Sequence, residues 1–493
     1  MSTVVQYTVH VPPTRRAVLK TASAILSGTA FPARHLRAAN PPSPVILKLG
    51  NYMAGAADRA LPEEVIEKTK HHTLDTLAAM VSGGELPPGR VALAMAKAHA
   101  GEKTATVVGS NLLCGPIEAA MINGMLAHSD ETDDSHAPSQ SHPGCSIVPA
   151  ALAASEQFGT GGKRMLRAVA LGYDVGTRVT MTLGALSYQM ETHHSAHSIA
   201  GDFGSAATAA CVAALNPQQM RWILDYAAQQ AAGIAAWQRD TDHIEKSLVF
   251  AGFPARNGVT AVLLIQLGGT GVDDIMAGAD NFLMAFNPKA DPDGLIDKLG
   301  ERYEVTRTNI KKWTVGSPIQ APLDALEAMR KKHPFEADQV QKVVVRMGTN
   351  DANTVNNREM PDISLQHMVA VMLVDKTASF AAAHDKARMQ DAAVLRQRAK
   401  VQLIADEALD KLHPARVSIV EVTLADGTKL TERVEAVRGT AENPMTREEV
   451  VSKARDLMSP LLGAAKSGKL IDQILALETV PDVRELRPLL QRG

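Results

Sequence analysis

The densest group of acid–base side chains in the sequence is the segment HSDETDDSH at residues 128–136, followed by HPG at 142–144. Together they bring four carboxylates and three histidines between two apolar, helix-like segments. Such a polar stretch would form a loop or a helix end on a rigid scaffold, where functional sites are usually found. Histidine titrates near neutral pH, and carboxylates orient imidazoles or share their protons. The segment therefore predicts general acid–base catalysis.

Two other interpretations of this segment remain open. Aspartate and histidine also bind metal ions. However, HExxH, CxxC and facial-triad spacings are absent from the sequence, so no metal is predicted. The other interpretation is a solvated acidic loop whose Asp and Ser residues cap helices.

A second histidine cluster, HHSAH at 193–197, precedes a Gly- and Ala-rich stretch at 199–215 that predicts a buried helix. A helix N-terminus carries partial positive charge and free N–H groups, so it would suit an anionic substrate. The alternative is a set of histidines that cap a helix at the surface. Lys246 and Lys311 would matter for an acidic substrate, although sequence alone does not distinguish them from surface lysines. Nucleotide-binding glycine patterns and the Gly-x-Ser-x-Gly elbow are absent.

The overall composition is that of an ordinary globular protein. Of the 493 residues, 45% are apolar and 21% are charged, which excludes large-scale disorder. The formal net charge of -2 argues against a nucleic-acid partner. No window has 18 consecutive apolar residues, so no membrane anchoring is predicted. Three cysteines are too few for a disulfide framework or a zinc ribbon.

The apolar periodicity predicts a mainly α fold with an α/β insert. The pattern is helical from residue 45 to about 307. Residues 340–347 then alternate like a strand, and 416–434 resemble a hairpin that turns at Asp426-Gly427. A helix-capping signal follows at 446–449. The expected domains are a discontinuous all-helical domain (41–306 and 439–493) and a smaller α/β lid domain (307–438).

The first forty residues are interpreted as a signal and spacer. Thr14-Arg15-Arg16 opens a twin-arginine pattern, and a modest apolar stretch follows at 22–31. This layout is typical of a Tat export signal and predicts a periplasmic protein. The alternative is an N-terminal extension that happens to carry Arg-Arg, which would leave the protein in the cytoplasm.

Seven stretches form an ordered set over residues 45–485. They are HSDETDDSHAPSQSHPG (128–144), LGYDVGTRV (171–179), HSIAGDFGSAATAA (197–210), EKSLVFAGFPARNGVTA (245–261), IKKWTVGSPIQAPLDAL (310–326), SLQHMVAVML (364–373) and GTAENPMTREEVVSKA (439–454). Together they resemble the MmgE/PrpD family, which includes 2-methylcitrate dehydratase, cis-aconitate decarboxylase and iminodisuccinate epimerase. The resemblance implies a helical domain interrupted by an α/β lid, a homodimer, and cofactor-free chemistry on a small polycarboxylate.

The resemblance also implies five catalytic residues. His142 would act as base or acid, and Glu131 or Asp133 would set its tautomer and pKa. The family usually has Asp where Glu131 stands. Lys246 would bind a carboxylate and stabilise the negative charge that builds as the proton leaves. His194, just before the Gly-rich helix, would protonate the leaving hydroxyl or the carbanion.

A second set of residues is implied to bind substrate. Lys311 would enter from the lid and bind a second carboxylate. His197 is a rival of His194, and His193 is the third histidine of that cluster. Two positions depart from the family, because Gly316 stands where His is frequent and His367 stands where Tyr is usual. The implied substrate-binding positions are Ser135, Asp134, His197, Lys311 and His367.

The chemistry shared by such proteins is proton movement at a carbon beside a carboxylate. We expect a lyase, specifically a hydro-lyase that resembles 2-methylcitrate dehydratase. The alternatives are an epimerase or isomerase, a decarboxylase acting on a related polycarboxylate, or an exported carboxylate-binding protein. Gly316 and His367 replace side chains that touch substrate in the decarboxylase, so cis-aconitate decarboxylation is not the first expectation.

Overall fold

The computed structural model describes residues 41–492, so the expected export signal lies outside the described residues. The chain from Pro42 onward forms one compact unit. Its buried apolar residues form two hydrophobic cores, one from Val45 to Ile310 and again from Met445 to Leu490, the other from Trp313 to Val422. The mainly α fold with a small α/β part is confirmed. The domain boundaries drawn from the sequence stay a prediction.

The first core is built around α9 (Ala196–Val212), every residue of which is buried. It packs against α6 (Gly144–Phe158), α7 (Gly162–Leu183), α10 (Pro217–Gln230) and α12 (Phe253–Gln266). Small residues permit this close approach. A Cβ on Gly176 of α7 would lie 2.2 Å from the carbonyl oxygen of Ala200. The other helices of this region are α2 (Pro44–Gly55), α3 (Glu63–Gly83), α4 (Pro87–Ala98), α5 (Pro116–Ala127), α8 (Ala185–Thr192), α11 (Ile244–Ser247) and α13 (Phe282–Phe286).

One continuous helical stretch, Ile244–Gln266, contains a π-helical turn at Leu248–Gly252 between α11 and α12. By length and composition it is the one described helix that could cross a membrane. However, 61% of its most apolar window is buried inside the fold. It packs against α5 and α9, so it behaves as a core helix. Helices with a π-turn are frequent at functional sites.

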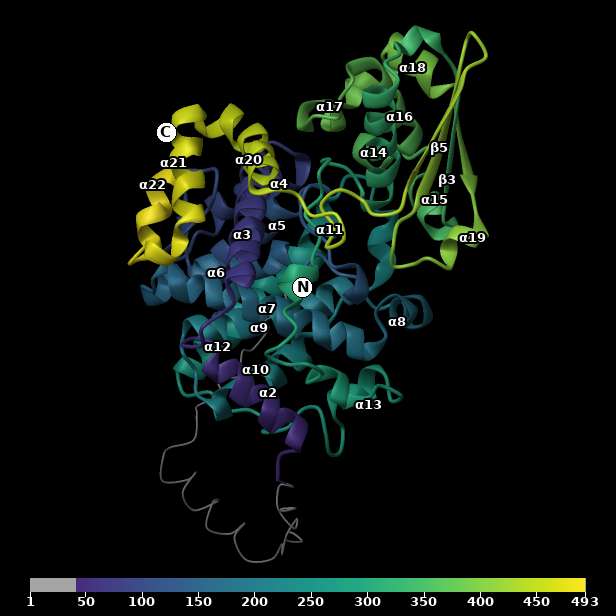
Figure 1. The fold of residues 1–493 in the computed structure, drawn as a ribbon. Coiled ribbons are helices and arrows are strands. Elements are labelled where there is room, and N and C mark those ends of the chain that lie inside the picture. The colour runs from purple at the N-terminus through teal and green to yellow at the C-terminus, as the bar shows by residue number, and fades with distance from the viewer. Residues whose placement is uncertain (1–40, 493) are drawn as a thin grey trace, which may run out of the picture. The chain divides into compact units, whose positions relative to one another are not determined.

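The second core lies in the α/β insert, which carries a four-stranded sheet in the order β4-β3-β5-β6. Strand β3 (Val340–Met347) is parallel to β4 (Val401–Ala405) and antiparallel to β5 (Ser418–Leu424). The predicted hairpin pairs β5 with β6 (Lys429–Val434) through a turn in which Gly427 has φ 88°. Helices α14, α16 and α18 lie on one side of the sheet (Figure 1). The insert's helices are α14 (Ser317–Lys332), α15 (Thr349–Val355), α16 (Leu365–Asp375), α17 (Phe380–His384), α18 (Ala392–Arg398) and α19 (Glu407–Asp410).

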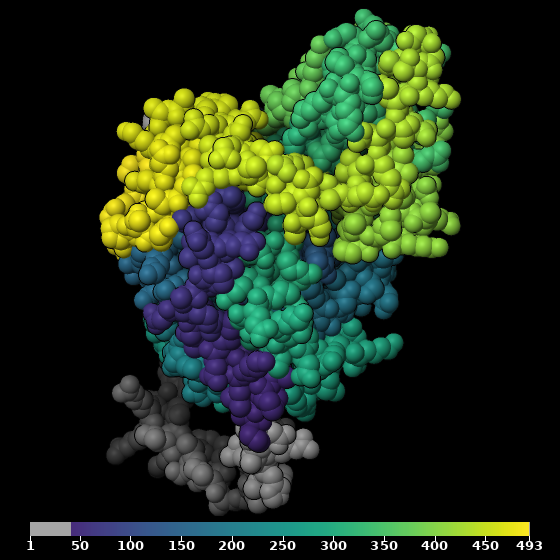
Figure 2. Space-filling model, in the orientation of Figure 1, coloured from purple at the N-terminus to yellow at the C-terminus, as the bar shows by residue number. Residues whose placement is uncertain are grey.

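After the insert, the chain returns to the first core as α20 (Arg447–Leu462), α21 (Ala464–Leu475) and α22 (Arg487–Leu490). The capping signal in the sequence is realised, because Thr446 and Glu449 form a reciprocal capping box at the start of α20. Helix α20 packs against α3. Figure 2 shows this C-terminal segment, in yellow, lying against the N-terminal helices, in purple. The structure also contains a short pair, β1 (Ala105–Thr106) with β2 (Leu113–Cys114), that the sequence did not predict.

Candidate active site

A cavity of about 720 Å³ lies between the helical residues and the α/β insert. The helical side contributes the acidic loop, defined here as residues 128–143 between α5 and α6, together with the α8–α9 junction and segment 234–250. The insert contributes residues 316–318 and 350–363. The volume falls within the range of small-molecule sites.

Asp134 fixes the acidic loop to the helices that pack around it. Its carboxylate accepts hydrogen bonds from the backbone N–H of Gly144 (2.9 Å), from Nδ1 of His72 (2.8 Å) and from the hydroxyl of Tyr173. These donors lie on α6, α3 and α7, so one side chain ties the loop to three helices. Asp134 itself does not line the cavity.

The C-terminal helix supports the same loop from another direction. Lys453 of α20 donates a hydrogen bond to the carbonyl oxygen of Thr132 at 2.9 Å and pairs with the carboxylate of Asp75 at 2.7 Å. Both partners are buried. A residue 321 positions away in the sequence therefore fixes the backbone beside the loop's carboxylates.

Glu131 lines the cavity and is held between two lysines. One carboxylate oxygen pairs with Lys246. The other lies 3.3 Å from Nζ of Lys311, which also donates to the Glu131 carbonyl oxygen at 2.8 Å. Burial alone would raise the pKa of Glu131, but Lys246 and Lys311 hold it well below its ordinary value. Glu131 is therefore an anion, and it orders the two ammonium groups beside the cavity.

Asp133 bridges two imidazoles. Its oxygens lie 2.9 Å from Nδ1 of His128 and 3.3 Å from Nδ1 of His142. Burial would raise the pKa of Asp133, but the two histidines and Lys311 hold it well below its ordinary value. Because a carboxylate only accepts hydrogen bonds, each Nδ1 carries the proton. Both rings are thereby oriented with Nε2 turned away from Asp133.

His142 combines this orientation with a neutral ring. Burial lowers the pKa of His142, and Asp133 opposes that shift without cancelling it. The ring lines the cavity. An oriented, unprotonated imidazole beside a cation is the arrangement that a general base requires.

The π-helical turn supplies an aromatic wall. Phe250 stacks on His197 with ring centroids 4.0 Å apart and on His128 with centroids 4.9 Å apart. Nζ of Lys246 lies 5.2 Å from the Phe250 centroid and 5.5 Å from that of Trp237, within the range of cation–π attraction. The turn thereby fixes the spacing of two imidazoles and one ammonium group.

The three histidines at residues 193–197 occupy different places. Ser195 caps α9, which puts His197 in the first turn, where it is buried and lines the cavity. Its ring centroid lies 5.2 Å from that of His142. His193 is exposed and lines the cavity mouth, whereas Nδ1 of His194 contacts the hydroxyl of Tyr188 at 2.6 Å and does not line the cavity. The geometry therefore favours His197 over His194 as the second acid–base group.

Family models for the MmgE/PrpD N-terminal domain and the MmgE/PrpD C-terminal domain match residues 47–294 and 313–478. The chain belongs to the MmgE/PrpD family. It is similar to a cis-aconitate decarboxylase-like protein of Aspergillus oryzae, with 24% identity over 477 residues that cover 91% of this chain and 98% of that protein. It is 24% identical to cis-aconitate decarboxylase of Aspergillus terreus over 483 residues (92% and 96% covered). It is 26% identical to that of Homo sapiens over 452 residues (87% and 91% covered). These relatives are lyases, which supports a lyase-type activity for this member of the family.

Some residues singled out from the sequence lie away from the cavity of this MmgE/PrpD protein. Ser135 and Lys311 line a neighbouring cavity of about 320 Å³, although Lys311 reaches the site through Glu131. His367 is fully buried in the core of the insert, where burial lowers its pKa to about 4. Gly316 lines the main cavity. The structure thus brings together Glu131, Asp133, His142, His197, Lys246 and Lys311, and leaves Ser135, Asp134, His194 and His367 outside this group.

Three groups at or beside the site were not predicted from the sequence. His243 lines the cavity, with Nε2 3.9 Å from a carboxylate oxygen of Glu131. Burial lowers its pKa well below the ordinary value, and Lys246 adds to that shift. His384 and Asp362 of the insert lie next to Asp130 of the acidic loop. His243 belongs to a polar turn at residues 240–245 and His384 is followed by Asp385 and Lys386, but no motif pointed to any of the three.

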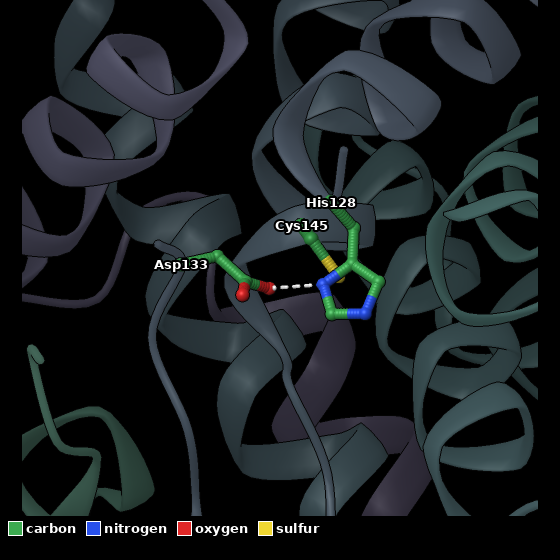
Figure 3. Close-up of side chains that lie close together, drawn as sticks. All are labelled: His128, Asp133 and Cys145. Carbon is green, nitrogen blue, oxygen red and sulfur yellow. Dashed lines mark hydrogen bonds and ion pairs between the residues drawn. The ribbon is translucent and has the colours of Figure 1, made fainter. Parts of the chain in front are cut away.

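Two groups of side chains have potential metal-ligand atoms within 4.8 Å of one another: His128, Asp133 and Cys145, and His128, Glu131 and His243. Figure 3 shows the first, with the Asp133 carboxylate bonded to the His128 ring and the Cys145 thiol beside it. Burial raises the pKa of the Cys145 thiol well above its ordinary value, and the Asp133 carboxylate of the same group already faces two imidazoles. In the second group, Glu131 already faces two ammonium groups. The carboxylate of each group is thus already paired within the protein and fits a metal ion poorly, whereas Nε2 of His128 and Nε2 of His243 have no hydrogen-bond partner among the described residues.

Proposed function

We propose that this MmgE/PrpD protein is a lyase that removes water from a small hydroxylated di- or tricarboxylate, in the manner of a 2-methylcitrate dehydratase. The observation that carries the proposal is His142, a buried imidazole whose pKa lies below its ordinary value and whose Nδ1 faces Asp133. Dehydration begins with loss of a proton from carbon, and this step needs a base of that kind.

The proposed reaction uses the charges around the cavity. Nε2 of His142 takes the proton from a carbon beside a substrate carboxylate, and Asp133 stabilises the imidazolium that forms. Lys246 stabilises the negative charge that develops on that carboxylate. The C=C bond forms as the C–O bond breaks. The departing hydroxyl takes the proton that His142 has removed and leaves as water, which returns His142 to its neutral form. The neutral ring of His197, whose centroid lies 5.2 Å from that of His142, orients this hydroxyl.

The second candidate is decarboxylation, which is favoured by the names of the relatives. In that reaction a C–C bond breaks, carbon dioxide leaves, and the carbanion is protonated on carbon. It needs an acid above all, whereas the imidazoles of His142 and His197 both have lowered pKa values. For this reason we place dehydration first.

The test is proton NMR in deuterated water with 2-methylcitrate, citrate, cis-aconitate, malate and iminodisuccinate. A lost C–H signal together with a new olefinic signal would support dehydration and identify the substrate. Conversion of cis-aconitate with release of carbon dioxide would contradict dehydration and support decarboxylation instead. Deuterium entry without an olefin would favour epimerisation. Binding without any exchange would contradict the enzyme proposal for this panel and favour a carboxylate-binding protein.

Export and homodimer formation are also proposals. Export rests on the twin-arginine pattern at Arg15-Arg16, and the homodimer rests on the family. Fractionation of cells that express wild-type protein or an Arg15→Lys/Arg16→Lys variant tests export, which predicts periplasmic protein for the wild type alone. Light scattering of the purified protein tests the dimer.

A further inference from the structure

The α/β insert contacts the acidic loop through one histidine. His384 ends α17, and its Nε2 lies 2.8 Å from a carboxylate oxygen of Asp130. The two side chains are 11% and 4% exposed, so water contributes little to this contact. Asp130 directly precedes Glu131, the carboxylate that holds Lys246 and Lys311. The contact therefore joins the insert to the residue next to the centre of the site.

The partners of His384 fix its protonation state. Nδ1 lies 2.7 Å from the carbonyl oxygen of Phe380, which only accepts hydrogen bonds. Nε2 faces Asp130, whose carboxylate already accepts from the backbone N–H and the hydroxyl of Thr132. Both ring nitrogens therefore face acceptors, and both must carry a proton. His384 is an imidazolium, in contrast to the neutral rings of His142 and His197 across the loop.

We propose that His384 is a positioning residue, whose imidazolium docks the α/β insert onto Asp130 and thereby holds Glu131 and its two lysines in the arrangement that binds substrate. The kinetic part of this inference rests on the proposed function. The structural part, that the charge on His384 orders the acidic loop, does not.

The charged groups around His384 give the proposal a pH dependence. The groups that face it are Asp130 on the acidic loop and Asp362 just before α16, with Glu131 and Lys246 beyond Asp362. Burial would lower the pKa of His384, but Asp130 and Asp362 raise it to about 9. A histidine whose pKa is raised on folding contributes its full stabilisation below the ordinary pKa of about 6.5 and loses it as the pH rises through the folded value. The docked contact is therefore lost as the pH rises through about 9.

The experiment compares three variants with the wild-type full chain by hydrogen-exchange mass spectrometry of residues 128–136. His384→Gln removes the charge, His384→Lys restores a cation that stays protonated beyond pH 9, and His333→Gln is the control at an exposed position of the same insert. We expect His384→Gln to lower the loop's protection by about 10- to 100-fold at pH 7, since hydrogen bonds to charged groups contribute about 1.5–3 kcal/mol. His384→Lys should restore part of the protection, and His333→Gln should match the wild type.

A pH series sharpens the test. After correction for intrinsic exchange rates, wild-type protection of the loop should fall between pH 8 and pH 10, while that of His384→Lys persists through pH 9. Equal protection in His384→Gln and wild type, or a wild-type curve that is flat across this range, would overturn the proposal. With a substrate that the protein turns over, His384→Gln should raise KM more than it lowers kcat. The reason is that contact between the α/β insert and the acidic loop completes the binding site. A looser loop in His384→Gln with no turnover of any panel compound would sustain this inference and contradict the proposed function.

Discussion

Asp130 and Glu131 are adjacent, both buried, and surrounded by opposite charge patterns. Glu131 is one carboxylate between two ammonium groups. On the Asp130 side, one imidazolium, His384, lies near two carboxylates, Asp130 and Asp362. The pKa of Glu131 falls well below its ordinary value, whereas burial raises that of Asp362 to about 6. Glu131 and Asp362 are buried to a similar degree, so the difference between their pKa values comes from the charges beside them.

The pKa values of the histidines also differ between the cavity side and the insert side of the acidic loop. On the cavity side, burial and the nearby lysines lower the pKa values of His142, His197 and His243. On the insert side, the two carboxylates raise that of His384 to about 9. One loop therefore separates neutral rings suited to proton transfer from a charged ring suited to docking.

The largest expected effect is on the cavity side. His142→Asn keeps a hydrogen-bond donor near the position of Nδ1 but removes the basic Nε2, so turnover of the identified substrate should fall about 10²–10⁴-fold. His193→Asn, at the exposed mouth of the cavity, is the matched control and should keep most of the activity. Steady-state kcat measurements decide the matter. Comparable kcat values for the two variants would remove His142 from the mechanism.

The second largest effect is expected on the free energy of unfolding. Lys311→Met leaves Glu131 and Asp133 buried with one fewer cation, which should cost about 3–5 kcal/mol of unfolding free energy. Adding Glu131→Gln should recover part of this loss because it removes the unpaired charge. Lys331→Met, which breaks an ion pair of an exposed lysine, should cost no more than about 1 kcal/mol. Urea unfolding of the four proteins measures these differences, and a cost for Lys311→Met no larger than for Lys331→Met would contradict the charge arrangement described here.

A smaller effect concerns the acid limb of the pH profile. Asp133 raises the pKa of His142 against the effect of burial, so Asp133→Asn should lower that pKa further. The base then stays unprotonated to lower pH, and the acid limb of kcat/KM should move down in pH. At the same time kcat should fall, because the imidazolium intermediate loses its counter-ion. A limb that stays in place would show that another group controls it.

The smallest effect is expected at Asp362. This carboxylate raises the pKa of His384, so Asp362→Asn should lower it, and the loop's exchange protection should be lost at a lower pH than in the wild type. Asp385→Asn, an exposed carboxylate beside His384 in sequence, is the control. Hydrogen exchange across pH 7–10 measures the shift. Identical curves for wild type and Asp362→Asn would leave Asp130 as the sole counter-ion.

The patterns that sequence analysis identified correctly are local ones. The Asp426-Gly427 turn joins β5 to β6, and Thr446 with Glu449 caps α20, because each signal lies within a few residues. The acidic loop at residues 128–143 was likewise visible as a dense polar segment and lies at the cavity. Such features depend on backbone preferences and short-range hydrogen bonds, which a single sequence records directly.

The remaining site residues depend on distant packing. Which histidine of residues 193–197 faces the cavity depends on where α9 begins, and a shift of the Ser195 cap by one residue would rotate every side chain by about 100°. His243 and His384 reach the loop from elements more than a hundred residues away. Helix periodicity predicts burial and gives no sign of which polar residues meet across an interface.

The hydrogen bond from Lys453 to the carbonyl oxygen of Thr132 affects when the active site can assemble during protein synthesis. The loop's backbone has all its hydrogen-bond partners only when α20 has folded onto α3, and Lys453 of α20 is synthesised 321 residues after Thr132. A nascent chain that ends before residue 447 lacks this support, so its carboxylates and lysines would not yet be assembled. Assembly of the active site therefore waits until residues 447–462 have been synthesised and have folded onto α3.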